Sequence, residues 1–305
     1  MKYSFLRMSQ NKLEESLKSA FNKKGFISLK GIFDKTKCSL LHSKIEKTRK
    51  IDSSLFLSKN EYEENKFKKP TVNPNLLDKL DLSFIYENQT FLNRIKLLLG
   101  DDFYLYASRI ICGIPNAFIP SWISEALDVK APNLGAFIKP EFNDIRYFHG
   151  IDYHMDMIDL SNEYSDILTI YIYLDHVGKE MSPLLLLPGT HYGGTDVYPH
   201  NLSENNNLIK YSPPNKKSIS STPYALEGNS SDAWLWHGCL LHGTKTNKTK
   251  KARYSIRLIY RKSPNSSTAF IDEINRKIKN TIALQKMTDT SRFDDPNQYS
   301  HIRKI

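Results

Sequence analysis

The sequence has few cysteines and no long hydrophobic run. Its three cysteines, Cys38, Cys112 and Cys239, have no paired spacing and form neither a CxxC motif nor the pattern of a disulfide-rich secreted domain. The N-terminal residues lack the apolar core of a signal peptide, and no apolar stretch reaches the length of a membrane span. These absences favour a reducing compartment, so we expect a cytoplasmic protein without a membrane partner.

A block of basic residues is also missing, although the chain is basic overall. Of 305 residues, 43 are Lys or Arg and 33 are Asp or Glu, which gives a formal net charge of +10. Such a charge suits nucleic acid, an acidic membrane surface or a small anionic substrate. The basic residues are scattered singly, which is typical of a solvated surface rather than of a nucleic-acid footprint. We therefore favour a small-molecule substrate, and the oligomeric state stays open.

A chain of 305 residues with 40% hydrophobic composition is long enough for one large domain or two small ones, and we favour one. Helices are expected near residues 13–24, 35–49, 91–99 and 271–284, and strands near 26–29, 103–112, 147–160, 167–175, 184–187, 233–237 and 254–261. This order predicts a helical part at about 10–100, a core at about 103–261 and a helical tail at 262–305. Many strands preceded by helices indicate a mainly β fold with flanking helices, a jelly roll.

Three segments show no clear periodicity. Residues 51–74 are polar and lysine-rich, which predicts a surface excursion or mobile loop. Residues 113–143 contain four prolines and a possible short helix at 122–127. This segment is interpreted either as a lid or wall beside a site or as a plain connector. A polar loop is expected from the turn after residue 187 to about residue 220.

The main chemical signal is His154-x-Asp156, which lies among apolar and aromatic residues. Read as a strand, this segment puts both side chains on one face, roughly 6.5 Å apart, where they can share a metal ion. Imidazole and carboxylate suit divalent iron among other metals. His149 is a rival for the first histidine, but no carboxylate follows it two residues later. A hydrogen-bonded pair on a strand edge is the alternative without a metal.

A third ligand must come from elsewhere in the chain. The best candidate is His242, with His237 five residues earlier as its rival and a satisfied core histidine as the alternative. Two histidines and one carboxylate with open coordination positions are typical of non-haem iron oxygenases. His191 follows a Pro-Gly turn and is interpreted as structural.

Four segments, in this order, resemble the phytanoyl-CoA dioxygenase family. They are Lys24-Gly-Phe-Ile-Ser-Leu-Lys-Gly-Ile-Phe33, His154-x-Asp156, Leu184-x3-Pro-Gly-Thr-His191 and His242-Gly-x3-Asn247-x5-Arg253. The resemblance covers roughly residues 20 to 261 and implies a cupin-like double-stranded β-helix. It also implies Fe(II) bound by His154, Asp156 and His242, with 2-oxoglutarate and O2 as cosubstrates and ascorbate as a support for activity. Asn247 and the Pro-Gly-Thr-His turn match family positions whose roles are mostly structural.

The resemblance implies that Arg253 pairs with the far carboxylate of 2-oxoglutarate. Strand alternation puts Arg253, Ser255 and Arg257 on one face, but the arginines lie on the order of 13 Å apart along the strand, so one small dicarboxylate cannot use both equally. We expect Arg253 to grip the carboxylate with its planar fork and Ser255 to add a hydrogen bond. Arg257 is then left for substrate or for an ion pair. Thr169 and Tyr171 are further candidates for contacts with 2-oxoglutarate or substrate, with ordinary cavity lining as the alternative.

The resemblance implies an enzyme that hydroxylates, or otherwise oxidises, a C–H bond of a small metabolite and releases succinate and CO2. Halogenating members of the family lack the carboxylate, whereas Asp156 is present here. One rival is a nucleic-acid or protein demethylase with the same iron site, which needs a basic and aromatic groove that scattered lysines do not predict. The other rival is a non-catalytic jelly-roll binding module, for which an incomplete ligand set would be expected.

Overall fold

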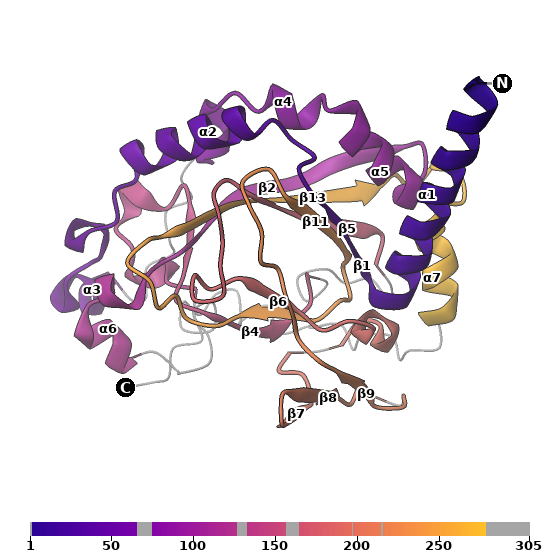
Figure 1. Cartoon of the computed structure of the whole chain (residues 1–305). Helices are drawn as coiled ribbons and strands as arrows, with labels where there is room; N and C mark the ends of the chain where they lie inside the picture. The colour runs from indigo at the N-terminus through magenta and orange to yellow at the C-terminus, as the bar shows by residue number, and fades with distance from the viewer. Residues whose placement is uncertain are drawn as a thin grey trace.

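The computed structural model describes residues 2–65, 75–126, 133–156, 165–196, 198–214 and 216–278. Two sheets form the core, and helices cover the outer face of the larger one (Figure 1). The helices are α1 (Lys2–Lys24), α2 (Lys35–Thr48), α3 (Lys59–Asn65), α4 (Ser83–Tyr86), α5 (Gln89–Leu99), α6 (Ser121–Ala126) and α7 (Phe270–Ile278). Within the described ranges, no helix has both the length and the apolar character that crossing a membrane requires.

The larger sheet has six strands in the order β1-β11-β5-β13-β2-β3, and the smaller has four in the order β10-β6-β12-β4. Their strands are β1 (Phe26–Leu29), β2 (Phe103–Gly113), β3 (Arg146–Phe148), β4 (Ile151–His154), β5 (Ile167–Tyr173), β6 (Leu184–Leu186), β10 (Tyr224–Ala225), β11 (Ala233–His237), β12 (His242–Thr244) and β13 (Arg253–Lys262). Strand β1 follows the first helix yet pairs with β11, Phe26 opposite Trp236. The predicted mainly β, jelly-roll fold with flanking helices is confirmed.

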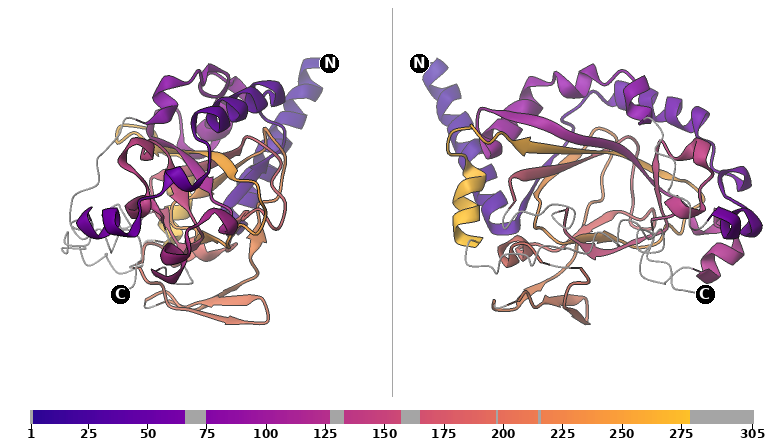
Figure 2. Two further views of the ribbon diagram at one scale, coloured as in Figure 1. Left: turned by 90° about the vertical axis from the view of Figure 1, so that its left-hand side faces the viewer. Right: turned by 180° about the vertical axis from the view of Figure 1, so that it is seen from behind.

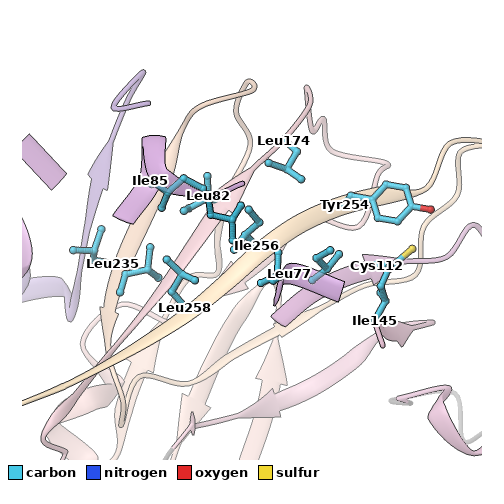
Figure 3. Packing of buried hydrophobic residues seen from close by; sticks show 14 of the residues in the cluster. Leu77, Leu82, Ile85, Cys112, Ile145, Leu174, Leu235, Tyr254, Ile256 and Leu258 are labelled. Carbon is cyan, nitrogen blue, oxygen red and sulfur yellow. The ribbon is translucent and has the colours of Figure 1, made fainter. Parts of the chain in front are cut away.

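Side chains along the strands of the larger sheet point alternately to its two faces, and each face lines a separate hydrophobic core. On β13, Ile256 and Leu258 pack with Leu82 and Ile85 beneath the helices (Figure 3). On the opposite face, aromatic side chains such as Tyr171 pack against the smaller sheet. Both faces are buried because helices cover one and the smaller sheet covers the other. Burying each such apolar side chain stabilises the fold by roughly 1.5–3 kcal/mol.

The helix ends follow the sequence signals. The Asp34 carboxylate accepts a hydrogen bond from the backbone N–H of Lys37 at 3.0 Å and so caps α2. Gly100 ends α5 with a φ of +85°, a conformation that glycine adopts without a steric penalty. Leu40 lies outside the buried face of α2 and is 64% exposed. The helix instead buries positions 38, 41, 42 and 45, which fit the helical period better.

Part of the expected surface excursion at 51–74 is packed core. Phe56 is buried, and the backbone N–H of Leu57 donates to the carbonyl oxygen of Phe137 at 2.8 Å. The ring of Tyr62 on α3 stacks on Phe137 at 4.9 Å and lies 5.6 Å from Trp122 on α6, so α3 and α6 lie side by side (Figure 2). Residues 51–65 are therefore held against the core through Leu55, Phe56 and Tyr62, while the other described side chains of this segment are half-buried or exposed. Residues 66–74 and 127–132 lie outside the described residues.

Two further expectations need correction. The polar loop before residue 220 is wrong, because β7 (Leu202–Asn205), β8 (Leu208–Tyr211) and β9 (Ile219–Ser221) form a small third sheet. The strand expected over 147–160 is broken, since β3 ends at Phe148 and β4 at His154, and Asp156 lies beyond its end. The expected C-terminal helix is present as α7, while the part of the prediction beyond residue 278 lies outside the described residues.

Candidate metal centre

Two adjacent strands of the smaller sheet bring two histidines together. His154 at the end of β4 lies directly opposite His242 at the start of β12, and their ring centroids are 4.4 Å apart. Directly opposite residues of antiparallel strands point to the same face. Asp156 follows β4 by two residues, and the three side chains offer ligand atoms that all lie within 4.8 Å of one another. The structure thus places the three expected ligands in one cluster.

The backbone fixes which nitrogen of each imidazole is free. Nδ1 of His154 lies 2.9 Å from the carbonyl oxygen of Asp152, and Nδ1 of His242 lies 2.9 Å from that of Leu240. A carbonyl oxygen only accepts hydrogen bonds, so each Nδ1 carries the proton and each Nε2 keeps its lone pair. Burial lowers the pKa of His154 to about 3 and also lowers the pKa of His242. Both rings are therefore neutral near pH 7, the form that binds a metal.

Four polar groups surround the Asp156 carboxylate, which is 1% exposed. Its Oδ2 accepts hydrogen bonds from the Thr169 hydroxyl at 2.6 Å and from the indole N–H of Trp236 at 3.0 Å. Its Oδ1 pairs with the guanidinium of Arg257, and Oδ2 lies 3.7 Å from Nε2 of His242. Burial alone would raise the pKa of Asp156, but Arg257 and the two histidines hold it below its usual value. The carboxylate is ionised and fixed in orientation.

The contact with Trp236 was missed from the sequence. The spacing of Trp234 and Trp236 by two residues in a five-residue strand could have indicated it, because this spacing turns both indoles to the inward face. Thr169, a candidate for contact with 2-oxoglutarate or substrate, lies opposite Trp236 in the β5–β11 register. The structure places its hydroxyl against the carboxylate of Asp156, so Thr169 and Trp236 orient this ligand together.

The donor set fits Fe(II). Two neutral imidazole nitrogens and one carboxylate leave open coordination positions, which is the arrangement of non-haem iron oxygenases. Each of the three ligands also has a hydrogen-bond partner that fixes its orientation, as metal ligands usually do. His154, Asp156 and His242 could therefore hold this ion.

A buried arginine lies on the same inward surface. Arg253 is 1% exposed; its Nη1 donates to the Ser255 hydroxyl at 3.2 Å, and its guanidinium lies 5.7 Å from the ring centroid of Tyr171. Its Nε and Nη2 are buried and have no hydrogen-bond partner among the described residues. Unsatisfied buried donors are costly, so these atoms suit a carboxylate that arrives with a ligand. Gly113 leaves this space free, because a Cβ there would lie 3.3 Å from both nitrogens.

The rival histidines have other partners. Nδ1 of His237 accepts from the backbone N–H of Cys239 at 3.2 Å, and Nε2 lies 3.3 Å from the Asn275 side-chain oxygen. Nε2 of His191 lies 3.1 Å from the carbonyl oxygen of Asn22, which agrees with a structural role. His149 and His237 are not among the metal-ligand clusters found in the described part of the chain.

Asn247 ties the turn before β13 to β2. Its side-chain nitrogen donates to the carbonyl oxygens of Gly113 at 3.2 Å and Lys251 at 2.8 Å, and its oxygen accepts from the backbone N–H of Thr249 at 3.0 Å. These bonds set the position at which β13 begins with Arg253. These contacts agree with the mostly structural role that the family resemblance implies for Asn247.

Some solved structures are similar to this chain, at low sequence identity. The epimerase SnoN from nogalamycin biosynthesis, a non-heme alpha ketoglutarate dependent enzyme, has a TM-score of 0.51 and 13% identity over 82% of this chain and 83% of its own. EctD from S. alaskensis with bound Fe matches with a TM-score of 0.48 and 15% identity over 83% of this chain and 78% of its own. EvdO2 from Micromonospora carbonacea var. aurantiaca, complexed with 2-oxoglutarate, matches with a TM-score of 0.49 and 15% identity over 83% of this chain and 92% of its own. At 13% identity, the similarity to SnoN speaks for the fold alone.

The sequence itself carries the family assignment. No curated protein is similar enough in sequence to match the chain. The family model described as phytanoyl-CoA dioxygenase (PhyH) matches residues 21–255, which include the three clustered ligands and the buried arginine. The chain belongs to the phytanoyl-CoA dioxygenase family and is a non-haem iron dioxygenase that depends on 2-oxoglutarate and O2.

Proposed function

We propose that this enzyme hydroxylates, or otherwise oxidises, a C–H bond of a small metabolite and releases succinate and CO2. We assign His154, Asp156 and His242 as the ligands of Fe(II). The observation that carries the proposal is the convergence of ligand atoms of these three side chains within 4.8 Å of one another, with Asp156 and His242 buried and His154 half-buried. When bound, Fe(II) and 2-oxoglutarate supply the oxidation of the C–H bond by O2.

The residues of the chain orient the metal ligands and the cosubstrate, and they exclude water. Thr169 and Trp236 hold the Asp156 carboxylate, and backbone carbonyls hold the two imidazoles with Nε2 toward the metal. Arg253, assisted by Ser255, would bind the far carboxylate of 2-oxoglutarate, with Tyr171 beside its guanidinium. The burial of these groups keeps water from the reacting atoms and strengthens each charge interaction.

Several finer features belong to the same proposal. Halogenating members of the family lack the carboxylate, whereas Asp156 is part of the ligand cluster, which favours hydroxylation over halogenation. A complete ligand set disfavours a non-catalytic binding module. The three cysteines are free and buried, which supports our inference of a cytoplasmic location. We also propose that residues 1–305 form one domain.

The decisive experiment is a screen of metabolite pools by mass spectrometry with Fe(II), 2-oxoglutarate and ascorbate. We expect one metabolite to gain one oxygen while succinate forms in equal amount, with Asp156→Ala as the inactive control. Products or succinate at the same level in both proteins would refute the proposal. Filter binding to DNA and RNA across salt concentrations separates the demethylase alternative, which requires binding that weakens as salt rises.

A further inference from the structure

We propose that Arg109 and Arg257 together bind an oxyanion of the substrate, a carboxylate or phosphate group, beside the iron site. This inference rests on the proposed function, because it assigns a chemical class to the substrate of the same site. It depends on the register between β2 and β13 and on the partners of the two guanidinium groups.

The register places the two arginines side by side. Arg257 on β13 lies directly opposite Arg109 on β2. Ile256 and Leu258, the neighbours of Arg257 on β13, face the helices, so both arginines lie on the opposite, inward face. The Cβ atoms of directly opposite residues lie roughly 4.5–5.5 Å apart. Two long cationic side chains thus extend from adjacent strands on the face that carries the iron site.

The positive charges of the two guanidinium groups are not fully balanced by neighbouring carboxylates. Like charges directly opposite each other destabilise a sheet. Arg109 is half-buried, and its guanidinium makes no hydrogen bond or ion pair with any residue in the described ranges. Arg257 pairs with Asp156, which is also a proposed metal ligand. A bound Fe(II) would draw on the same carboxylate, so metal binding would leave the two arginines short of an anion.

The cosubstrate does not supply this anion. Arg253 already offers two unpaired buried donors to 2-oxoglutarate, whereas Arg257 lies four residues further along β13, roughly 13 Å away. The exposure also differs, because the side chain of Arg257 is 30% exposed and Arg253 is 1% exposed. Arg257 is therefore reachable by a molecule that enters from solvent. Two planar forks on one side of a site match the oxygens of a carboxylate or phosphate.

The neighbours of the pair fit a substrate that is not wholly polar. Tyr171 lies opposite Arg257 on β5, so Arg109, Arg257 and Tyr171 form one row across three strands. An aromatic residue in register with the two arginines adds apolar character next to the charged group. We therefore infer a metabolite whose anionic group is held in this row while a neighbouring C–H bond faces the iron.

The test uses the full chain loaded anaerobically with Fe(II) and saturating 2-oxoglutarate. Calorimetric titrations with inorganic phosphate, propionate and neutral propionamide measure binding to the loaded protein. We expect an oxyanion to bind and propionamide not to bind. Arg109→Gln should weaken oxyanion binding at least tenfold and Arg109→Lys by less, with iron content and 2-oxoglutarate affinity unchanged. The control Arg94→Gln removes the same charge from α5, on the helical side, and should leave oxyanion binding unchanged.

Each outcome has a distinct meaning. Tighter binding of phosphate than of propionate assigns a phosphate-bearing substrate, and the reverse assigns a carboxylate. A loaded wild-type protein that binds neither oxyanion, or that binds propionamide equally well, refutes the oxyanion site and leaves the proposed oxygenase function standing. A loss of 2-oxoglutarate affinity in Arg109→Gln, with probe binding intact, would make the pair a cosubstrate anchor and overturn the inference. Failure of the wild-type protein to bind Fe(II) refutes the proposed function itself.

Discussion

Replacing Arg253 by lysine should weaken 2-oxoglutarate binding roughly tenfold to a hundredfold. Lysine keeps the positive charge but has no planar fork, so it cannot make two parallel hydrogen bonds to one carboxylate. In the structure, Nε and Nη2 are the buried donors without a partner in the described ranges, and Nη1 is already engaged by Ser255 at 3.2 Å. One lost hydrogen bond to a charged group costs about 1.5–3 kcal/mol, which corresponds to this range of affinity.

The assay is an anaerobic titration of the iron-loaded protein with 2-oxoglutarate, followed by the absorbance of the iron–cosubstrate complex. Arg257→Lys is the matched variant, because it makes the same chemical change on the same face of β13. We expect it to alter 2-oxoglutarate affinity less than about threefold, since this arginine is not placed to hold the cosubstrate. If Arg257→Lys weakens binding more than Arg253→Lys does, the assignment of the anchor is wrong.

Three further predictions test other parts of the site. Trp236→Phe removes the indole donor to the carboxylate of Asp156 and should lower Fe(II) affinity about tenfold or more, as loss of such partners usually does. Trp234→Phe is the control, because the Trp234 indole nitrogen has no partner in the described ranges, and it should leave Fe(II) affinity unchanged. Equal losses of Fe(II) affinity in the two variants would contradict the role of the hydrogen bond. Gly113→Ala should weaken 2-oxoglutarate binding several-fold by pressing on the buried guanidinium, and unchanged affinity would show that the guanidinium can move aside. Burial lowers the pKa of His154 to about 3 and of His237 to about 4. Below pH 6.5 the unfolded chain therefore takes up protons that the folded, metal-free chain does not. Unfolding titrations should show a loss of about 1.6 kcal/mol for each histidine between pH 6.5 and 5, whereas a constant unfolding free energy would refute this.

Residue spacing predicted the ligands better than it predicted their local structure. The two-residue interval between His154 and Asp156 identified the pair, although Asp156 lies beyond the end of β4. Its carboxylate is held by Trp236 from the other sheet, and the segment leaves the strand there. A strand pattern fixes which face a side chain takes, but it does not fix where the strand ends.

Contacts between strands that are distant in the chain could not be predicted from the sequence. The pairing of Arg109 with Arg257 depends on the register between β2 and β13, and alternation within each strand is compatible with several registers. The hairpin of β7 and β8, by contrast, had a readable signal. Asn206 and Asn207 connect its strands with φ angles of 48° and 65°, the left-handed conformation that asparagine tolerates in tight hairpin turns. The polar surroundings hid it, because the strands are short and mostly exposed.

The central claim is that His154, Asp156 and His242 bind the Fe(II) that supports the oxidation of 2-oxoglutarate by O2. Anaerobic equilibrium binding of Fe(II), combined with succinate formation in air, tests it most directly. We predict one Fe(II) per chain in the wild-type protein, and loss of both iron and succinate in His154→Ala and His242→Ala. His237→Ala, which removes a buried histidine outside the cluster, should be less stable but should keep its iron. Unchanged iron content and succinate formation in both His154→Ala and His242→Ala would contradict the assignment.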